Sequence, residues 1–521
     1  MKRLFNITVI VIVVVLLLSV NVLANCPSCD KLSCSSFVAG KLATTDGYTM
    51  SGHTCDGDCD FTLKVIPAAD HDPDEKYVID WEGLPGGFVH TVKAEIPQVP
   101  HTNKYFLIET PIGNEYQVFF GENTTSTKEE LWEFSEDEGI IDWTELPALA
   151  LQRGKTAREC ILVIGKLIEK YGMNGSGESL LISDPNEAWV LEVPGFSYQW
   201  VAQRIPDDQV CPHANRMRIG EVDLEDTEHF LASPNLIKLP QEKGLYDPEK
   251  DGPFNFWKVY DGSTSVGDSR REWRMLSLLC PSKNWDPDAE TYPFSVKPEF
   301  KISPQWWIEN VWRDHMEGTP YDMTKGIAAG PFGNPERPSI SGVSSERAIS
   351  IPRTSYSWVS QSRSGLPDPV GGVIWFAMDA PHSSCYVPFY MGISQTPKSW
   401  RSGDFTKFSK DSARWWFQLI DNYSCLRFNE MNKEVRDTFD PMEEKYFAMQ
   451  NYLEKQAFEM YNTDPVAAEY FLTTYCSNSA LEVEKTAKDL FFYLIAKYAD
   501  GGPSTTVSDE WKKLLEKEVV Q

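Results

Sequence analysis

Cys34 begins a segment whose residue types could support thiol chemistry. A short apolar run follows it, then the pair Asp46-Gly47, and then a second run that ends in His53 and Asp56. Two such runs around Asp-Gly are typical of a β-hairpin, which returns His53 and Asp56 to the end where Cys34 lies. A cut before Cys34 would give that residue a thiol nucleophile and a free α-amine, which can act as a base because its reference pKa is about 8.

The alternative is a structural cysteine on an ordinary hairpin, since free cysteine is among the most buried residue types. The order of cysteine, short strand, Asp-Gly turn, second strand and acidic residue resembles the start of mature PepD-type dipeptidases and their secernin relatives. These proteins are N-terminal-nucleophile (Ntn) cysteine hydrolases. The resemblance continues in separate blocks to about Tyr498, at residues 153–159, 186–192, 200–208, 317–323, 329–337, 353–358, 371–379 and 386–390.

The resemblance implies a cysteine dipeptidase in which the Cys34 thiolate attacks a peptide carbonyl. It implies that Asp56 orients the α-amine and that Asn215, in the segment His213-Ala214-Asn215-Arg216, stabilises the oxyanion. Without the resemblance, Asn215 reads as a turn residue capping a strand. Arg353 is expected to be an electrostatic partner of Cys34 or a clamp for a substrate carboxylate.

His53 departs from the family pattern. Close PepD-type relatives carry an Arg-Asn-Glu-Asp run where this chain has His53-Thr54-Cys55-Asp56. An imidazolium could hold Asp56 or the Cys34 thiolate only while protonated, so a catalytic His53 predicts a narrow, bell-shaped pH profile. Otherwise His53 is a surface residue in the outgoing loop, and Arg353 is the better candidate for the cation.

The elements that must position these residues follow from the pattern of apolar residues. Residues 61–121 are strand-like, residues 145–171 have helical periodicity, and three runs within 179–204 form an antiparallel meander. This order indicates a layered α+β fold. With the strand-rich block 343–393 it predicts two antiparallel sheets between helical layers, and the resemblance implies the four-layer αββα sandwich of Ntn hydrolases.

The chain is expected to be processed twice. Lys2 and Arg3 precede an apolar run, and small residues allow cleavage after Ala24, so residues 1–24 are predicted to be a signal peptide. An uncleaved anchor and a lipid-modified Cys26 are the alternatives. Residues 25–33 then form a short propeptide. The predicted location is secreted, periplasmic or lumenal.

The mature chain is expected to hold one catalytic domain and a helical extension. The domain spans residues 34–430, with an irregular, acidic insertion around 216–300 that lies near the active site. Residues 431–521 form C-terminal helices packed on that domain, with helical patterns between Asp440 and Tyr498.

The 11 cysteines bear on the compartment, because thiols outside the cytosol tend to pair. Without Cys34 ten remain, an even number. The pairs Cys26/Cys29 and Cys55/Cys59 are locally suggestive, although connectivity cannot be read from spacing. A zinc site from these four is the alternative, but Cys55 is expected to be bridged rather than catalytic. We expect no metal and no cofactor.

The balance of acidic and basic residues limits the kinds of molecule that the protein is expected to bind. With 49 basic and 76 acidic residues the net charge is −27, which argues against nucleic acid and anionic membranes. A dipeptide or short peptide with a free amino group is compatible with this field. The oligomeric state stays open. The alternatives are an amidase acting on a non-peptide amide of the penicillin or bile-salt type, and a catalytically silent exported binding protein on the same scaffold.

Overall fold

The computed structural model describes residues 33–80, 93–135, 138–263, 265–336, 346–499, 507 and 509–519. The predicted signal peptide, the pair Cys26/Cys29 and all of the predicted propeptide except Ser33 lie outside these ranges. Within them, no helix is both long and apolar enough to cross a membrane.

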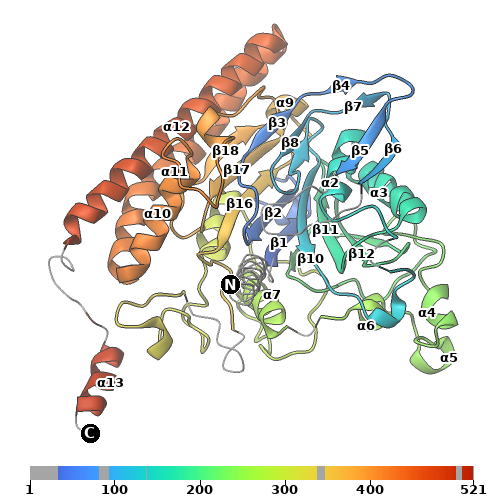
Figure 1. Ribbon diagram of the computed structural model, residues 1–521, viewed down its shortest axis with the longest axis horizontal. Helices are drawn as coiled ribbons and strands as arrows, with labels where there is room; N and C mark the ends of the chain where they lie inside the picture. The colour runs from blue at the N-terminus through green and yellow to red at the C-terminus, as the bar shows by residue number, and fades with distance from the viewer. Residues whose placement is uncertain are drawn as a thin grey trace, which may run out of the picture.

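A six-stranded antiparallel sheet contains the predicted hairpin (Figure 1). Its strand order is β14-β1-β2-β16-β17-β18, so the hairpin of β1 and β2 lies inside the sheet, and neighbouring strands on both sides fix it. The strands are β1 (Ser33–Ala39), β2 (Met50–Asp56), β14 (Val210–His213), β16 (Thr354–Gln361), β17 (Val373–Met378) and β18 (Val387–Tyr390).

A second antiparallel sheet has eight strands in the order β15-β13-β12-β11-β10-β9-β8-β3. The predicted meander forms its centre. The strands are β3 (Lys64–Ile66), β8 (Tyr105–Leu107), β9 (Gly113–Asn114), β10 (Phe119–Thr124), β11 (Gly177–Ser183), β12 (Ala188–Pro194), β13 (Val201–Arg204) and β15 (Phe230–Ala232). Two small ribbons pair β4 (Ala69–Asp70) with β7 (His101–Thr102) and β5 (Lys76–Asp80) with β6 (Lys93–Pro97).

The two large sheets contact each other through small and polar side chains. Ser36 Oγ on β1 donates to the Glu122 carbonyl on β10 at 3.1 Å, and the hydroxyls of Ser51 and Ser183 lie 2.9 Å apart. A Cβ on Gly121 would lie 3.1 Å from the Gly52 carbonyl oxygen, so glycine permits this close approach. The layer between the sheets is therefore polar, and it is where the candidate residues lie.

The apolar cores lie on the outer sides of the sheets, under helices. Helices α2 (Glu145–Arg153) and α3 (Ala157–Tyr171) pack on β10–β12 through residues such as Ile164 and Trp189. Helices α10 (Arg414–Ser424), α11 (Phe428–Tyr461) and α12 (Pro465–Lys497) cover β17 and β18 (Figure 1). The expected mixed architecture of antiparallel sheets and helices is confirmed.

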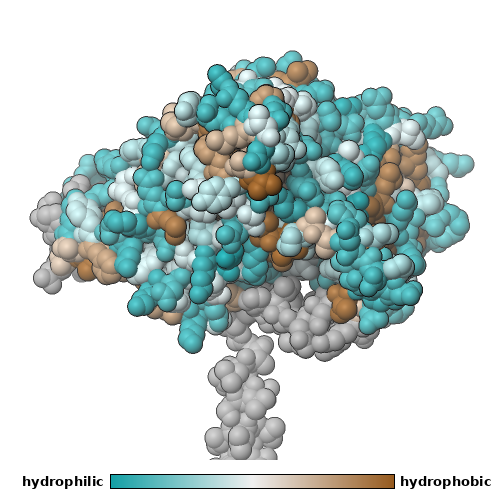
Figure 2. All heavy atoms as spheres, turned by 90° about the horizontal axis from the view of Figure 1, so that it is seen from above, coloured by the Kyte–Doolittle hydropathy of each residue, from teal (hydrophilic) through white to brown (hydrophobic). Residues whose placement is uncertain are grey.

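The remaining helices are short, apart from α7 (Val266–Leu279) and α13 (Asp509–Val519). The short α-helices are α4 (Lys238–Glu242), α5 (Pro248–Asp251), α6 (Phe256–Tyr260), α8 (Pro304–Trp307) and α9 (Asp368–Gly371). Single helical turns are η1 (Lys41–Ala43), η2 (Glu129–Leu131), η3 (Ile308–Trp312), η4 (Ile327–Ala329), η5 (Lys398–Trp400) and η6 (Cys425–Arg427). Figure 2 shows a face on which hydrophilic residues predominate and apolar residues form separate groups.

The helical pattern predicted over residues 145–171 is two helices rather than one. The break falls at Gly154, where an added Cβ would lie 2.5 Å from Cys160 Sγ, and Thr156 then caps α3 by accepting from the Glu159 amide. An N-cap threonine with Glu three residues on is the sequence signature of a new helix start. The periodicity therefore identified the buried face, while the capping residues decided the boundary.

The expectation that the other ten cysteines pair is wrong for most of those described. Cys55 and Cys59 form a disulfide, as expected for Cys55. The other described cysteines are free and buried: Cys34, Cys160, Cys211, Cys280, Cys385, Cys425 and Cys476. All seven are buried, as free cysteine commonly is.

Glu109 makes folding stability depend on pH. It lies between β8 and β9 and is 8% exposed, and burial raises the pKa of its carboxyl to about 8 although the Asp60 amide donates to it. A raised carboxyl pKa stabilises the fold fully below its ordinary value, and this contribution is lost as the pH rises through about 8. Between the ordinary carboxyl pKa of 4.5 and the raised value of about 8, we expect the free energy of unfolding to fall by up to about 1.4 kcal/mol per pH unit.

Urea denaturation of Glu109→Gln between about pH 5 and pH 8 measures this contribution. The variant should have a flatter pH dependence than the wild type, while Glu130→Gln, which changes an exposed carboxylate, should follow the wild-type curve. Parallel curves for wild type and Glu109→Gln would show that Glu109 does not titrate in this range.

Candidate active site

The hairpin holds the predicted residues in register, which confirms that part of the sequence analysis. Cys34 is directly opposite Cys55, Ser33 opposite Asp56, and Ser36 opposite His53. Side chains alternate between the faces of a strand, so Cys34, His53 and Cys55 are on one face near each other. The connecting loop includes Gly47 at φ 75°, a left-handed conformation that favours glycine.

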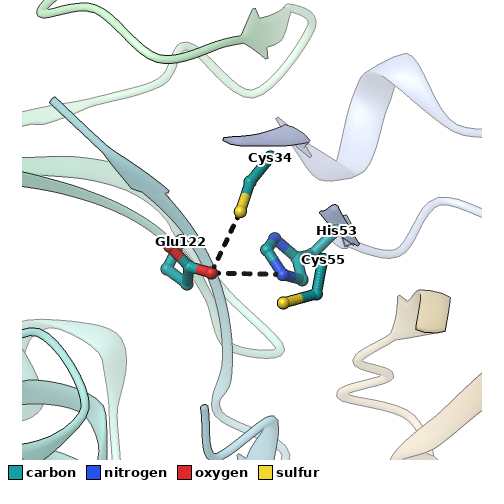
Figure 3. Close-up of side chains that lie close together, drawn as sticks. All are labelled: Cys34, His53, Cys55 and Glu122. Atoms are coloured by element: carbon teal, nitrogen blue, oxygen red, sulfur yellow. Dashed lines mark hydrogen bonds and ion pairs between the residues drawn. The ribbon is translucent and has the colours of Figure 1, made fainter. Parts of the chain in front are cut away.

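The Cys34 thiol lies buried in the layer between the sheets and is 1% exposed. Its Sγ donates to Glu122 Oε1 on β10 at 3.2 Å, and His53 Nε2 lies 3.4 Å from the same oxygen (Figure 3). The second His53 nitrogen, Nδ1, lies 3.2 Å from Ser36 Oγ. Sequence analysis missed Glu122, which stands 88 positions from Cys34 and has no local signal.

The electrostatics of this layer keep the thiol protonated. Burial, and then the negative charges of Glu122 and Asp56, raise the pKa of Cys34 well above its ordinary value. The carboxyl of Glu178 is also fully buried, and burial followed by the neighbouring Glu122 raises its pKa strongly. While Ser33 is joined to Cys34, the Cys34 nitrogen is an amide without basicity. Thiolate formation therefore needs a base supplied at the site.

The His53 imidazole differs from the expected cation. Burial lowers the pKa of His53, which outweighs the raising effect of Glu122 and Asp56, so a neutral ring is favoured at neutral pH. The ring also faces Glu122, whereas Asp56 pairs with Arg347. The structure therefore does not support an imidazolium that replaces the family guanidinium, and the bell-shaped profile expected from it loses its basis.

Asp56 is held from several sides. It is fully buried and accepts from Thr354 Oγ1 at 2.5 Å and from Thr54 Oγ1 at 3.2 Å, in addition to its ion pair with Arg347. Arg347 also donates to the Ser33 hydroxyl. Sequence analysis did not identify Arg347, which is the residue that pairs with Asp56.

Arg353 lies on the side of the chain that precedes Cys34. Its Nη2 donates to Ser33 Oγ at 2.8 Å. Burial, and then the neighbouring Arg347, lower the pKa of its guanidinium. This position is one residue away from the thiol, where a group bonded to the Cys34 nitrogen or a substrate carboxylate would lie.

Asn215 lies against the Cys34 backbone. The Cys34 amide donates to Asn215 Oδ1 at 3.1 Å, and Asn215 Nδ2 donates to the Thr124 carbonyl at 3.0 Å. An amide nitrogen carries two hydrogens, so one N–H of Asn215 is left over for a further acceptor. Asn215 therefore contacts the Cys34 nitrogen directly, and its remaining N–H can donate to a further acceptor beside Cys34.

Sequence analysis also missed Arg271. It comes from α7, within the insertion expected around residues 216–300, and it is fully buried. Its guanidinium donates to the Cys34 carbonyl, to Ser35 Oγ at 2.9 Å and to Asn215 Oδ1 at 2.7 Å. A signal was present, because Arg271 lies four residues before the buried Met275 and so on the apolar face of the helix.

Asn123 completes the hold on the nucleophile's backbone. Its Nδ2 donates to the Cys34 carbonyl at 2.8 Å, from the strand that also supplies Glu122. Two donors, Asn123 and Arg271, therefore converge on one carbonyl oxygen. This backbone is fixed more firmly than a strand hydrogen bond alone would fix it.

The four side chains of Figure 3 are of types that bind metals, and their potential ligand atoms lie within 4.8 Å of one another. The sulfur of Cys55, however, is bonded to Cys59. A disulfide sulfur is not a thiolate ligand, so the set reduces to Cys34, His53 and Glu122. We therefore interpret this group as a buried thiol with polar neighbours.

The fold and this site combine antiparallel sheets and helices with a buried cysteine between the sheets. A profile of peptidase family C69 matches residues 33–440, and the chain belongs to this family of peptide hydrolases. The PepD-type resemblance is thereby confirmed at the level of the family.

The similar curated proteins are named as dipeptidases. A probable dipeptidase of Latilactobacillus sakei is 25% identical over 501 residues, which cover 92% of this chain and 98% of the relative. A probable dipeptidase of Salmonella dublin is 31% identical over 254 residues, 48% of this chain and 54% of the relative, so the match spans about half of that protein. Dipeptidase A of Lactobacillus helveticus is 28% identical over 313 residues, 58% and 61% of the two chains.

Proposed function

We propose that this protein is an exported Ntn-type cysteine dipeptidase whose nucleophile is Cys34. The observation that carries the proposal is the arrangement at Cys34, with the nitrogen on Asn215 Oδ1 and the thiol on Glu122. The family match and the names of the relatives support peptide hydrolysis. The stacking of the two sheets between helices supports the four-layer αββα sandwich of Ntn hydrolases.

The first step of the proposal exposes the amine. The Cys34 thiol adds to the Ser33 carbonyl carbon, the carbon–nitrogen bond breaks, and the nitrogen takes a proton to become the Cys34 α-amine. Water then hydrolyses the resulting thioester and releases the segment that ends in Ser33. Glu122 Oε1, 3.2 Å from Sγ, is placed to accept the thiol proton at the start. Arg353, which bonds the Ser33 hydroxyl, positions the departing segment.

The same thiol then cleaves the substrate. The α-amine accepts the thiol proton, directly or through water, and the thiolate attacks the peptide carbonyl. Asn215 serves in two ways: Oδ1 accepts from the amine, and the second N–H of Nδ2 donates to the oxyanion. The amine returns the proton to the leaving nitrogen, and water resolves the acyl-enzyme. Asp56, which is held by its ion pair with Arg347, places a negative charge at the end of the hairpin and orients the α-amine.

The substrate proposed is a dipeptide or short peptide. The net charge of −27 is compatible with a substrate that carries a free amino group. After Ser33 leaves, Arg347 and Arg353 lose a hydroxyl partner and are placed to bind a carboxylate. The alternatives are an amidase that acts on a non-peptide amide, and a binding protein that keeps residues 25–33.

The mature terminus tests the proposal. Mass spectrometry of the protein recovered from the exported fraction should find a chain that begins at Cys34, and that chain should hydrolyse dipeptides. A terminus at Asn25 without hydrolysis would instead support the binding protein. Parallel assays with a penicillin and with a bile-salt amide separate the two enzyme alternatives, because a dipeptidase should prefer the dipeptide in kcat/KM.

A further inference from the structure

A second group of chemically competent side chains lies outside the Cys34 site, beyond β17 and at the end of α10. It consists of His382, Asp421 and Cys425, and potential ligand atoms of all three lie within 4.8 Å of one another. The side chains are buried, with exposures of 1%, 0% and 8%. The mechanism proposed above uses none of them.

Two buried atoms of this group make no hydrogen bond. His382 Nε2 and Asp421 Oδ2 have no hydrogen-bond partner among the described residues. His382 Nε2 lies 2.8 Å from Asp421 Oδ1, yet the pair lacks hydrogen-bond geometry. A buried polar atom without a partner costs about 1–3 kcal/mol, so a cluster that aims several such atoms at one region is expected to have an occupant.

The neighbours orient the three side chains as metal ligands are oriented. His382 Nδ1 lies 2.8 Å from Ser350 Oγ and 3.2 Å from His315 Nε2. When Nδ1–H donates to the Ser350 hydroxyl, Nε2 carries the lone pair that a metal needs. Asp421 Oδ1 accepts from Ser383 Oγ at 2.9 Å. Partners that fix the tautomer of a ligating histidine and the rotamer of a ligating carboxylate are a regular feature of metal sites.

The spacing also fits a shared ligand. Asp421 and Cys425 are four residues apart, where α10 continues into η6, and residues at this spacing lie on one helix face. The loop after β17 contributes His382 from the other side.

A Cys-His-Asp catalytic triad fits the same residues less well. In a triad the nucleophile and the carboxylate lie at opposite nitrogens of the imidazole. Here the nitrogen opposite Nε2 is bonded to Ser350, and the cysteine and carboxylate ligand atoms lie close to each other. All three groups therefore face a common point rather than forming a relay.

We propose that His382, Asp421 and Cys425 bind one zinc ion that joins the loop after β17 to the end of α10. Nitrogen, thiolate and carboxylate donors match zinc better than calcium or magnesium, which take oxygen donors. Burial of the three ligands assigns the ion a structural role. Binding releases the Cys425 thiol proton and stabilises the folded chain.

The full-length purified protein tests this proposal by metal analysis and by cobalt substitution. We expect about one zinc per chain, in keeping with a single site. Replacement of zinc by Co²⁺ should produce visible d–d bands and a near-ultraviolet thiolate-to-cobalt band. The thiolate band should be lost in Cys425→Ser and weakened in His382→Gln and Asp421→Asn. Chelation should lower the Tm of the wild type and leave Cys425→Ser unchanged.

Two control variants assign the band to this group. Cys476→Ser removes another buried free thiol, in α12, and Cys34→Ala removes the thiol beside His53 and Glu122. Both should keep the band. A wild-type protein that holds no zinc and gives no cobalt band would overturn the proposal, and so would a band that survives Cys425→Ser or disappears in Cys34→Ala. The wild-type spectrum decides the question even if a ligand variant does not fold.

Discussion

Cys34→Ala will abolish dipeptide hydrolysis, with kcat/KM falling by at least about 10³-fold when the mature terminus is supplied by an engineered cleavage site. The reason is that every proposed step uses the Cys34 sulfur as the nucleophile. In the unaltered precursor the same substitution should also leave residues 25–33 attached. Peptide hydrolysis and intact mass, measured on the same preparations, check both effects.

Cys160→Ala provides the matched control for this result. Cys160 is also a buried free thiol, but it lies in α3 under the other sheet. Its loss should leave processing and kcat/KM close to the wild type. Dipeptide hydrolysis retained by folded Cys34→Ala would contradict the proposed mechanism and leave the binding or another enzymatic function to be considered.

Arg271→Lys will lower kcat/KM by about 10²-fold, because small displacements of a nucleophile have effects of this size. Burial lowers the pKa of Arg271 to about 10, so the guanidinium is charged at neutral pH. It contacts the Cys34 carbonyl and Asn215 at once, which a lysine ammonium cannot do with the same fork geometry. Steady-state kinetics should show the loss mainly in kcat.

Arg271→Met should in addition destabilise the fold by about 3–5 kcal/mol, because it leaves the Asp268 carboxylate without its partner. Arg274→Met is the control on the same helix. Arg274 forms an ion pair with Asp314, which the substitution breaks, and it has no hydrogen bond to Cys34. That variant should lose stability but keep kcat/KM. Equal kinetic losses in Arg271→Lys and Arg274→Met would show that α7 supports the fold rather than the nucleophile.

The sequence by itself determined the local parts of this protein. The two apolar runs and the Asp-Gly pair were sufficient to predict the hairpin and to place Cys34 and Asp56 at the same end. The connection, however, is the loop of residues 40–49 rather than a tight Asp-Gly turn, and the register came from the structure. The meander of β11–β13 was predicted from the strand-like apolar runs and the turns between them. Strands that are consecutive in the sequence pair with each other, so local patterns were sufficient. Asn215 was placed beside Cys34 by resemblance, since a residue that ends a strand has no local property that names its partner.

Only the tertiary structure decided which groups surround the thiol. Glu122 and Arg271 are 88 and 237 positions from Cys34, and they meet it because the second sheet stacks on the first and α7 covers its edge. The expected cationic role of His53 was revised for the same reason, and Arg347 was not foreseen. A histidine's charge depends on its burial, and a cation's partner depends on which arginine the fold places nearer to Asp56, which is Arg347. Burial and long-range proximity arise from packing, and a linear pattern of residue types does not encode them locally.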